Sequence, residues 1–161
     1  MTLYLIRHAE ALTRQEAGVD ADADRPLSPS GLRAIQGVGR QLRAHGVKPT
    51  SVVSSPLLRA RQTAEQLAGL LDWTDAPMIW EMLSPDREAD EALEEMRKRR
   101  LNGTVLAIGH QPLLGHVIAQ LLRGQLSNGI SLRPGSVCEL QLPAFPRTFQ
   151  ATLGKLWQPE V

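Results

Sequence analysis

Short apolar runs separated by longer amphipathic segments dominate the pattern of this chain. Residues 3–6 and 104–108 are apolar and contain β-branched side chains, which is typical of strands buried on both faces of a sheet. Residues 51–54 form a third run of this kind, and residues 78–80 predict a short edge strand. The spacing between these runs leaves room for a helix after each strand.

Two of the intervening segments begin with the same helix-start signal. The first helix is expected to begin at Ser28-Pro29, with the serine as N-cap and the proline at the first helical position. Gly46 is expected to end this helix as a left-handed cap. Ser55-Pro56 repeats the start signal, and therefore predicts a second helix directly after another strand.

Two further helices are predicted in the second half of the chain. Residues 88–100 begin with acidic and end with basic side chains, as the helix dipole favours. Their apolar stripe is thin, so we expect this helix to lie at the surface. Pro112 begins the last helix, and Gly124 is expected to end it.

Near its end the chain changes to an alternating pattern with a period of two. Residues 137–142 and 148–153 alternate in this way, and residues 143–147 are expected to join them as a hairpin at a sheet edge. Together with the preceding order of strands and helices, this predicts an α/β fold. We expect a single three-layer domain spanning residues 1–161. Its sheet would be mixed but mostly parallel, with helices on both faces and an antiparallel edge hairpin.

Composition and charge narrow the class of protein. The chain has 161 residues, 42% of them hydrophobic, which is enough for one domain with a substantial core. A formal net charge of +1 gives no reason to expect nucleic acid or a membrane as partner. The sequence shows no signal peptide and no apolar run of about 20 residues, and its single cysteine excludes an intrachain disulfide. We therefore expect a cytoplasmic protein.

Two histidines lie directly after the two longest apolar runs. His8 follows the first run and its neighbour Arg7, and His110 follows the second. Open α/β sheets bind ligands at the carboxyl ends of their parallel strands. Arg59 is expected in the first turns of the second helix, whose N-terminus attracts anions. The four side chains therefore predict a site for a phosphoryl group, which His8 would attack while the other three bind its oxygens.

The polar segment at residues 10–24 is expected to be a loop. Its Asp20, Asp22 and Asp24 superficially match a calcium-binding loop, which needs glycine at its sixth position and glutamate at its twelfth. Arginine and glycine stand at these two positions, so we reject calcium. The carboxylates are expected to be solvated.

Three motifs stand out when these residues are considered together: Arg7-His8, SPLLRARQT at residues 55–63, and Gly109-His110. They resemble the motifs of the histidine phosphatase superfamily, which has the phosphoglycerate mutase-like fold. Residues 25–28 (RPLS, with Gly31 after them) and 108–115 (IGHQPLLG) are most similar to the SixA-type phosphohistidine phosphatases. The resemblance spans nearly the whole chain.

The resemblance implies a mixed α/β sheet with helices on both faces, in agreement with the hydrophobic pattern. It also implies that His8 is phosphorylated transiently and that water then releases inorganic phosphate. Arg7, Arg59 and His110 would form the phosphate pocket. Fixed positive charge would take the place of a metal ion, so neither a metal nor another cofactor is expected.

Three further residues are candidates for this site. Larger members of the superfamily use an acidic residue to protonate the leaving oxygen, and Glu81 is the candidate here; the alternative is a solvated loop glutamate. Arg25 is a candidate substrate contact or, equally, a member of a loop salt bridge. Gln111, which follows His110, is a candidate phosphate ligand through its backbone N–H.

The leading expectation is an enzyme that hydrolyses phosphohistidine on a partner protein of the phosphotransfer type. Imidazole is a weakly basic leaving group, with a conjugate-acid pKa of about 6.5, whereas an alkoxide approaches the about 15.7 of water. A site with a weak acid would therefore favour phosphohistidine, and the short segments between the motifs predict a shallow cleft open to a displayed histidine.

Three alternative functions stay open. One is a small-molecule phosphomonoesterase or mutase of the same superfamily, in which a mobile loop closes over the substrate. Another is a non-catalytic module that binds phosphorylated ligands. A metal-dependent hydrolase is the least favoured, because two histidines without carboxylate partners are too few ligands.

Overall fold

The computed structural model describes residues 1–122, 130–143 and 150–159. Its strands are β1 (Thr2–Arg7), β2 (Ser51–Ser54), β3 (Met78–Ile79), β4 (Thr104–Gly109), β5 (Val137–Gln141) and β6 (Thr152–Trp157). Its α-helices are α1 (Arg14–Ala17), α2 (Pro29–Ala44), α3 (Leu58–Leu70), α4 (Ala89–Lys98) and α5 (Leu113–Leu121). Two short 3₁₀ helices are η1 (Asp22–Asp24) and η2 (Glu81–Leu83).

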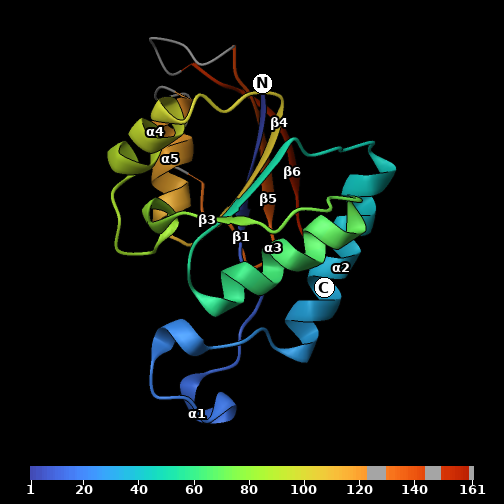
Figure 1. The fold of residues 1–161 in the computed structure, drawn as a ribbon, viewed down its shortest axis with the longest axis vertical. Coiled ribbons are helices and arrows are strands. Elements are labelled where there is room, and N and C mark those ends of the chain that lie inside the picture. Colours follow the sequence, from blue (N-terminus) through green and yellow to red (C-terminus); the bar gives the residue numbers. More distant parts are fainter. Residues whose placement is uncertain (123–129, 144–149, 160–161) are drawn as a thin grey trace.

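The six strands form one mixed sheet in the order β3-β2-β4-β1-β5-β6. β1 pairs in parallel with β4, β4 with β2, and β2 with β3. β5 is antiparallel to β1, and β6 is antiparallel to β5. Figure 1 shows the strands running through the middle of the molecule, with the loop that carries α1 beyond the carboxyl end of β1. The α/β class and the antiparallel edge pair are confirmed.

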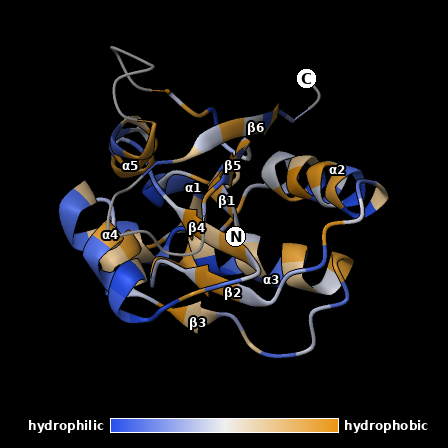
Figure 2. Cartoon of the chain, turned by 90° about the horizontal axis from the view of Figure 1, so that it is seen from above, coloured by the Kyte–Doolittle hydropathy of each residue, from blue (hydrophilic) through white to orange (hydrophobic). Residues whose placement is uncertain are grey.

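Helices cover both faces of the sheet, as predicted (Figure 2). α2 and α3 pack on one face, where they bury Tyr4 and Ile6 of β1, whereas α4 and α5 cover the face that carries Leu3 and Leu5. This alternation follows from the two-residue period of a strand. It anchors β1 on both sides and so holds the residues at its end. Among the described residues, no helix is long and apolar enough to cross a membrane.

Two elements begin later than predicted. α3 begins at Leu58, and its N-cap residue Leu57 supplies no side-chain cap; the hydroxyl of Ser55 contacts His110 and accepts from Leu57 N (3.3 Å). β6 begins at Thr152, so residues 150 and 151 of the predicted strand 148–153 do not belong to it, and residues 148 and 149 lie outside the described residues. Its register follows from Trp157, which pairs with Val137 and is buried at 4% exposure. The alternating pattern of 148–153 does not include this anchor.

The two later helices also refine the expectation. α4 is not a purely superficial helix, because its residues Leu93 and Met96 are buried against α5 and the sheet. α5 ends at Leu121. The predicted end at Gly124 lies outside the described residues, as do residues 144–147 of the predicted hairpin turn.

A close backbone approach fixes the segment between β1 and α2. The side chain of Ser28 accepts a hydrogen bond from Gly31 N (3.0 Å), which confirms the predicted cap, and its N–H donates to the carbonyl of Glu10 (2.9 Å). A Cβ added to Gly31 would overlap this same carbonyl. The residue after Ser30 must therefore be glycine if the helix is to close on the segment that follows His8.

We predict that Gly31→Ala lowers the free energy of unfolding by about 2–3 kcal/mol, because the backbone has no room to yield. Gly37→Ala in the same helix is the matched control, since a Cβ there meets only the end of the Arg40 side chain, at 3.9 Å. That control should be stabilising by about 0.5–1 kcal/mol. Urea denaturation of both variants measures the change in the free energy of unfolding. Equal changes would contradict the close approach of Gly31 to the carbonyl of Glu10.

Candidate active site

The two histidines meet because of the register between the central strands. β1 and β4 pair in parallel with Arg7 opposite Gly109, so His8 and His110 are the residues that directly follow the two strands. His8 N donates to the carbonyl of Gly109 (3.0 Å), which extends the pairing by one residue. The centroids of the two imidazole rings lie 4.9 Å apart. The predicted convergence of the two strand ends is therefore present.

His8 has a defined protonation pattern. Its Nδ1 lies 2.7 Å from the carbonyl oxygen of Ala9, and because a carbonyl only accepts, Nδ1 carries the hydrogen. Nε2 then keeps its lone pair, and Arg59 Nε donates to it at 3.3 Å. Burial lowers the pKa of His8 to about 4, with a smaller contribution from the neighbouring guanidinium groups. At neutral pH the ring is an uncharged nucleophile with its lone pair at Nε2.

His110 is the more deeply buried of the two rings, with 2% of its surface exposed. Burial lowers its pKa to about 3, and the charges of His8 and Arg59 act in the same direction. Its Nε2 lies 2.7 Å from the hydroxyl of Ser55. Its Nδ1 is buried and has no hydrogen-bond partner in the described part of the chain. One ring nitrogen is thus held by the protein, and the other is available to a ligand.

Arg59 lies in the first turn of α3 and is only 5% exposed. Its helix is tied to the segment after His8 by Thr63, whose hydroxyl donates to the carbonyl of Arg59 (2.7 Å) and accepts from Ala9 N (3.1 Å). This link places the guanidinium beside the lone pair of His8. The sequence predicted this convergence from the position of Arg59 after a parallel strand, although it placed the helix start two residues too early.

Arg7 completes the group of four. Its Nη1 donates to the carbonyl of Leu132 (2.7 Å), while its Nε is buried without a partner. Burial lowers the pKa of Arg7, but a guanidinium stays charged at neutral pH. Its charge contributes to the lowered pKa of both His8 and His110. A buried N–H without an acceptor is a donor that an anion would satisfy.

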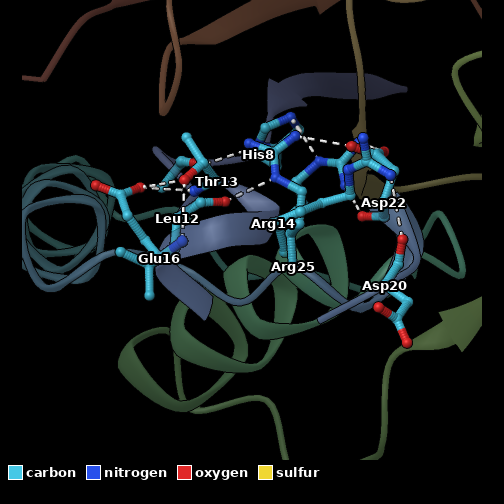
Figure 3. A network of polar contacts seen from close by, with 10 residues as sticks. His8, Leu12, Thr13, Arg14, Glu16, Asp20, Asp22 and Arg25 are labelled. Atoms are coloured by element: carbon cyan, nitrogen blue, oxygen red, sulfur yellow. Dashed lines mark hydrogen bonds and ion pairs between the residues drawn. The ribbon is translucent and has the colours of Figure 1, made fainter. Parts of the chain in front are cut away.

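Asp22 is a member of this cluster that the sequence did not predict. Arg59 donates to its backbone carbonyl (2.8 Å) and to its Oδ2 (2.9 Å), and Arg25 donates to its Oδ1 (2.8 Å). Figure 3 shows His8, Asp22 and Arg25 gathered beside the loop. Asp22 is exposed, as expected for this loop, but its carboxylate also pairs with Arg59, because the loop folds back over α3. It occupies donors of Arg59 that would otherwise be open to an anion.

Of the two remaining charged candidates, Arg25 joins the cluster and Glu81 does not. Arg25 forms the loop salt bridge with Asp22, and its Nε donates to the carbonyl of Leu12 (2.7 Å). Glu81 begins η2 and is exposed. Within residues 1–122, 130–143 and 150–159, its carboxylate forms no hydrogen bond or ion pair with the four central side chains. Its role as an acid stays a prediction.

The side chain of Gln111 has a structural task. Its Oε1 accepts from the backbone N–H of Gly115 (3.0 Å), and its Nε2 donates to the carbonyl of Ile130 (3.1 Å). These bonds satisfy the start of α5 and fix the backbone directly after His110. The expected contribution of its backbone N–H to phosphate binding stays a prediction.

The arrangement suits a compact, multiply charged anion. The neutral imidazole of His8 accepts a hydrogen bond from the Arg59 guanidinium at its lone pair, and the imidazole of His110 presents an unpartnered nitrogen. Fixed charges in such a desolvated site act more strongly than they would in water. Over the part of the chain that is described, no three His, Cys, Asp or Glu side chains are arranged to hold a metal ion.

We predict that both rings stay uncharged through the neutral and weakly acidic range. Because burial lowers both pKa values, protonation requires a pH near 4 for His8 and near 3 for His110, instead of about 6.5. NMR titration of the ring protons of the free protein measures this. A midpoint near pH 6.5 for either ring would show that the site is more hydrated than the structure indicates.

We also predict that Asp22 competes with anions for Arg59. Asp22→Asn should tighten the binding of inorganic phosphate about two- to fivefold, the amount expected for a partly exposed ion pair. Asp24→Asn removes the same charge from the same 3₁₀ helix without touching Arg59, and should change affinity less. Calorimetry at neutral pH compares the variants; equal or weaker binding by Asp22→Asn is the contrary result.

Comparisons with known proteins agree with this geometry. The family model of the histidine phosphatase superfamily (branch 1) matches residues 3–84. Phosphohistidine phosphatase SixA of Escherichia coli is 28% identical over 129 residues, which cover 78% of this chain and 76% of that protein. The probable phosphoglycerate mutase GpmB of Yersinia pestis is 33% identical over 113 residues, or 65% of this chain and 51% of that protein.

The fold is also similar to a solved structure of SixA complexed with tungstate, with a TM-score of 0.87. The two chains are 22% identical, and the match covers 99% of this chain and 97% of that one. The sheet order, the converging strand ends and the matching family model lead to one conclusion: this chain belongs to the histidine phosphatase superfamily, branch 1.

Proposed function

We propose that this protein is a phosphohistidine phosphatase, which removes a phosphoryl group from a histidine of a partner protein through a transient phospho-His8. Membership of the superfamily supports a phosphatase with a histidine nucleophile. The likeness to SixA supports phosphohistidine as the substrate class. We further propose that residues 1–161 act as one catalytic domain in the cytoplasm.

In the first step, Nε2 of His8 attacks phosphorus and the bond from phosphorus to the substrate imidazole breaks. The electron pair of that bond leaves with the substrate ring, whose other nitrogen carries a hydrogen, so the ring departs as a neutral imidazole. Positive charge develops on the ring of His8, where the hydrogen bond from Nδ1–H to the carbonyl of Ala9 stabilises it. Arg7, Arg59 and His110 bind the phosphoryl oxygens and hold the group in line with the lone pair.

In the second step, water attacks the phosphorus of phospho-His8. The bond from Nε2 to phosphorus breaks, its electron pair returns to His8, and the proton lost by water remains with the inorganic phosphate. The low pKa of His8 helps here, because the ring departs as a neutral imidazole. Asp22 can return to Arg59 when the phosphate ion leaves.

The charge state of the nearby carboxyl groups is the observation that carries the choice of substrate. Asp22 contacts the cluster, but its hydrogen bonds from Arg25 and Arg59 lower its pKa, so it is ionised and cannot supply a proton. Glu81 is exposed, and in the described residues it takes no part in these hydrogen bonds. A weakly basic imidazole can leave without strong acid assistance, whereas a sugar alkoxide cannot.

A small-molecule phosphomonoesterase is the second candidate. The likeness to the probable phosphoglycerate mutase GpmB favours it, as does the position of Glu81 in η2, next to the end of β2. If a substrate brought Glu81 to its leaving oxygen, this residue could act as the acid. A non-catalytic phosphate-binding module would need no nucleophile with a free lone pair.

The substrate classes are separated by measuring turnover of a histidine-phosphorylated phosphotransfer protein and of 3-phosphoglycerate. We expect the phosphoprotein to have the higher kcat/KM and Glu81→Gln to leave its hydrolysis within about twofold, since no strong acid is required. Full activity in a chelator is expected, because Arg7 and Arg59 supply the positive charge. Faster turnover of the ester, with a large loss in Glu81→Gln, would favour the second candidate.

Trapping the intermediate tests the nucleophile. Brief exposure to the phosphoprotein and a quench without acid should leave a phosphoryl group on His8, located by mass mapping. His8→Ala should remove this label and lower turnover by at least about 10³-fold, as for other nucleophiles. The control His116→Ala changes an exposed histidine of α5 and should keep both. Label on another residue, or an active His8→Ala, would refute the mechanism.

A further inference from the structure

Ser55 is a fully buried residue at the junction of β2 and α3 whose hydroxyl faces His110. Its backbone N–H donates to the carbonyl of Ile108 on β4 (3.0 Å), so the residue is held in the sheet. Its Oγ lies 2.7 Å from His110 Nε2 and accepts a second hydrogen bond from Leu57 N (3.3 Å). The sequence pattern predicted that this serine caps a helix, whereas in the structure its hydroxyl contacts His110.

Counting hydrogens decides the direction of the bond between Ser55 and His110. The serine hydroxyl has one hydrogen, and in the described residues its only acceptor is Nε2 of His110. If Nε2 donated instead, the serine hydrogen would be buried without an acceptor, which is costly. The unpartnered Nδ1 would then point a lone pair at the anion site. With the serine as donor, the hydroxyl hydrogen is satisfied, and Nδ1 carries a hydrogen that a bound anion can accept.

We propose that Ser55 is a positioning residue that fixes the tautomer of His110, so that Nδ1–H serves as a neutral hydrogen-bond donor to the phosphoryl group. The catalytic part of this proposal rests on the proposed function; the tautomer itself does not. Among the described residues, no hydrogen bond joins Ser55 to the nucleophile His8. Ser55 acts only through the ring of His110.

The proposal gives the two neighbouring imidazoles opposite roles. His8 is fixed by a carbonyl acceptor, so it presents a lone pair, whereas His110 is fixed by a hydroxyl donor, so it presents an N–H. Neither ring needs a positive charge for this, which agrees with the low pKa values of both. Two identical side chains 4.9 Å apart thereby become nucleophile and oxyanion donor.

Long-range ¹H–¹⁵N spectra of the free protein at neutral pH test the tautomer directly, since they distinguish a protonated ring nitrogen from an unprotonated one. We expect a protonated Nδ1 in His110, and a shift of the population toward protonated Nε2 in Ser55→Ala. A protonated Nε2 in the wild-type protein would overturn the proposal. An unchanged tautomer in Ser55→Ala would overturn the role of Ser55.

Kinetics tests the consequence for catalysis. Ser55→Ala leaves Nε2 without a donor in the required tautomer, so turnover of the phosphoprotein should fall about 10- to 100-fold. Ser136→Ala is the matched control: Ser136 is equally buried, but its hydroxyl has no partner in the described residues. It should keep wild-type turnover. Equal activity of the two variants would overturn the catalytic part of the proposal.

The two proposals fail in different ways. If the wild-type protein hydrolyses no phosphohistidine, the proposed function fails while the spectra still decide the tautomer of His110. If the protein is an active phosphatase and Nδ1 of His110 is unprotonated, the proposed function stands and the inference about Ser55 fails.

Discussion

The parallel register of β1 with β4 is the constraint on which the site depends. Because Arg7 lies opposite Gly109, the next residue on each strand is a histidine, and the two rings face each other. A slip of one residue in this register would move every side chain of β1 to the other face of the sheet. The two apolar clusters to which β1 contributes would oppose such a slip. The core therefore determines the position of the nucleophile. β1 buries Leu3 and Leu5 on one face of the sheet and Tyr4 and Ile6 on the other, and this register sets where His8 leaves the strand.

Desolvation and positive charge then give the site its character. Both imidazoles are kept neutral by burial, and the guanidinium groups next to them act in the same direction. A collection of cations without anions would be costly to bury. In the free protein Asp22 offsets part of this cost at Arg59, so the site holds an internal counter-ion that an incoming phosphoryl group can replace. Binding is thus an exchange of one anion for another.

The sequence carried enough information for the central part of the site but not for its periphery. His8, His110 and Arg59 follow strands or begin a helix, so local pattern and the geometry of parallel sheets bring them together. Asp22 could not be found in this way, because its contact with Arg59 depends on how an irregular loop folds over α3. The pattern SPLL looked like a capped helix start, yet Ser55 is used by His110 across the sheet, a tertiary contact that overrides a local preference. The late start of β6 has the same origin, since Trp157 is buried by its neighbours.

The central claim is that four side chains, distant in sequence, bind one tetrahedral anion. A crystal structure of the protein with vanadate measures this directly. The account predicts vanadium in line with Nε2 of His8, oxygens within hydrogen-bond distance of Arg7, Arg59 and Nδ1 of His110, and Asp22 displaced from Arg59. Vanadate bound elsewhere, or bound here without contact to His8, would contradict it.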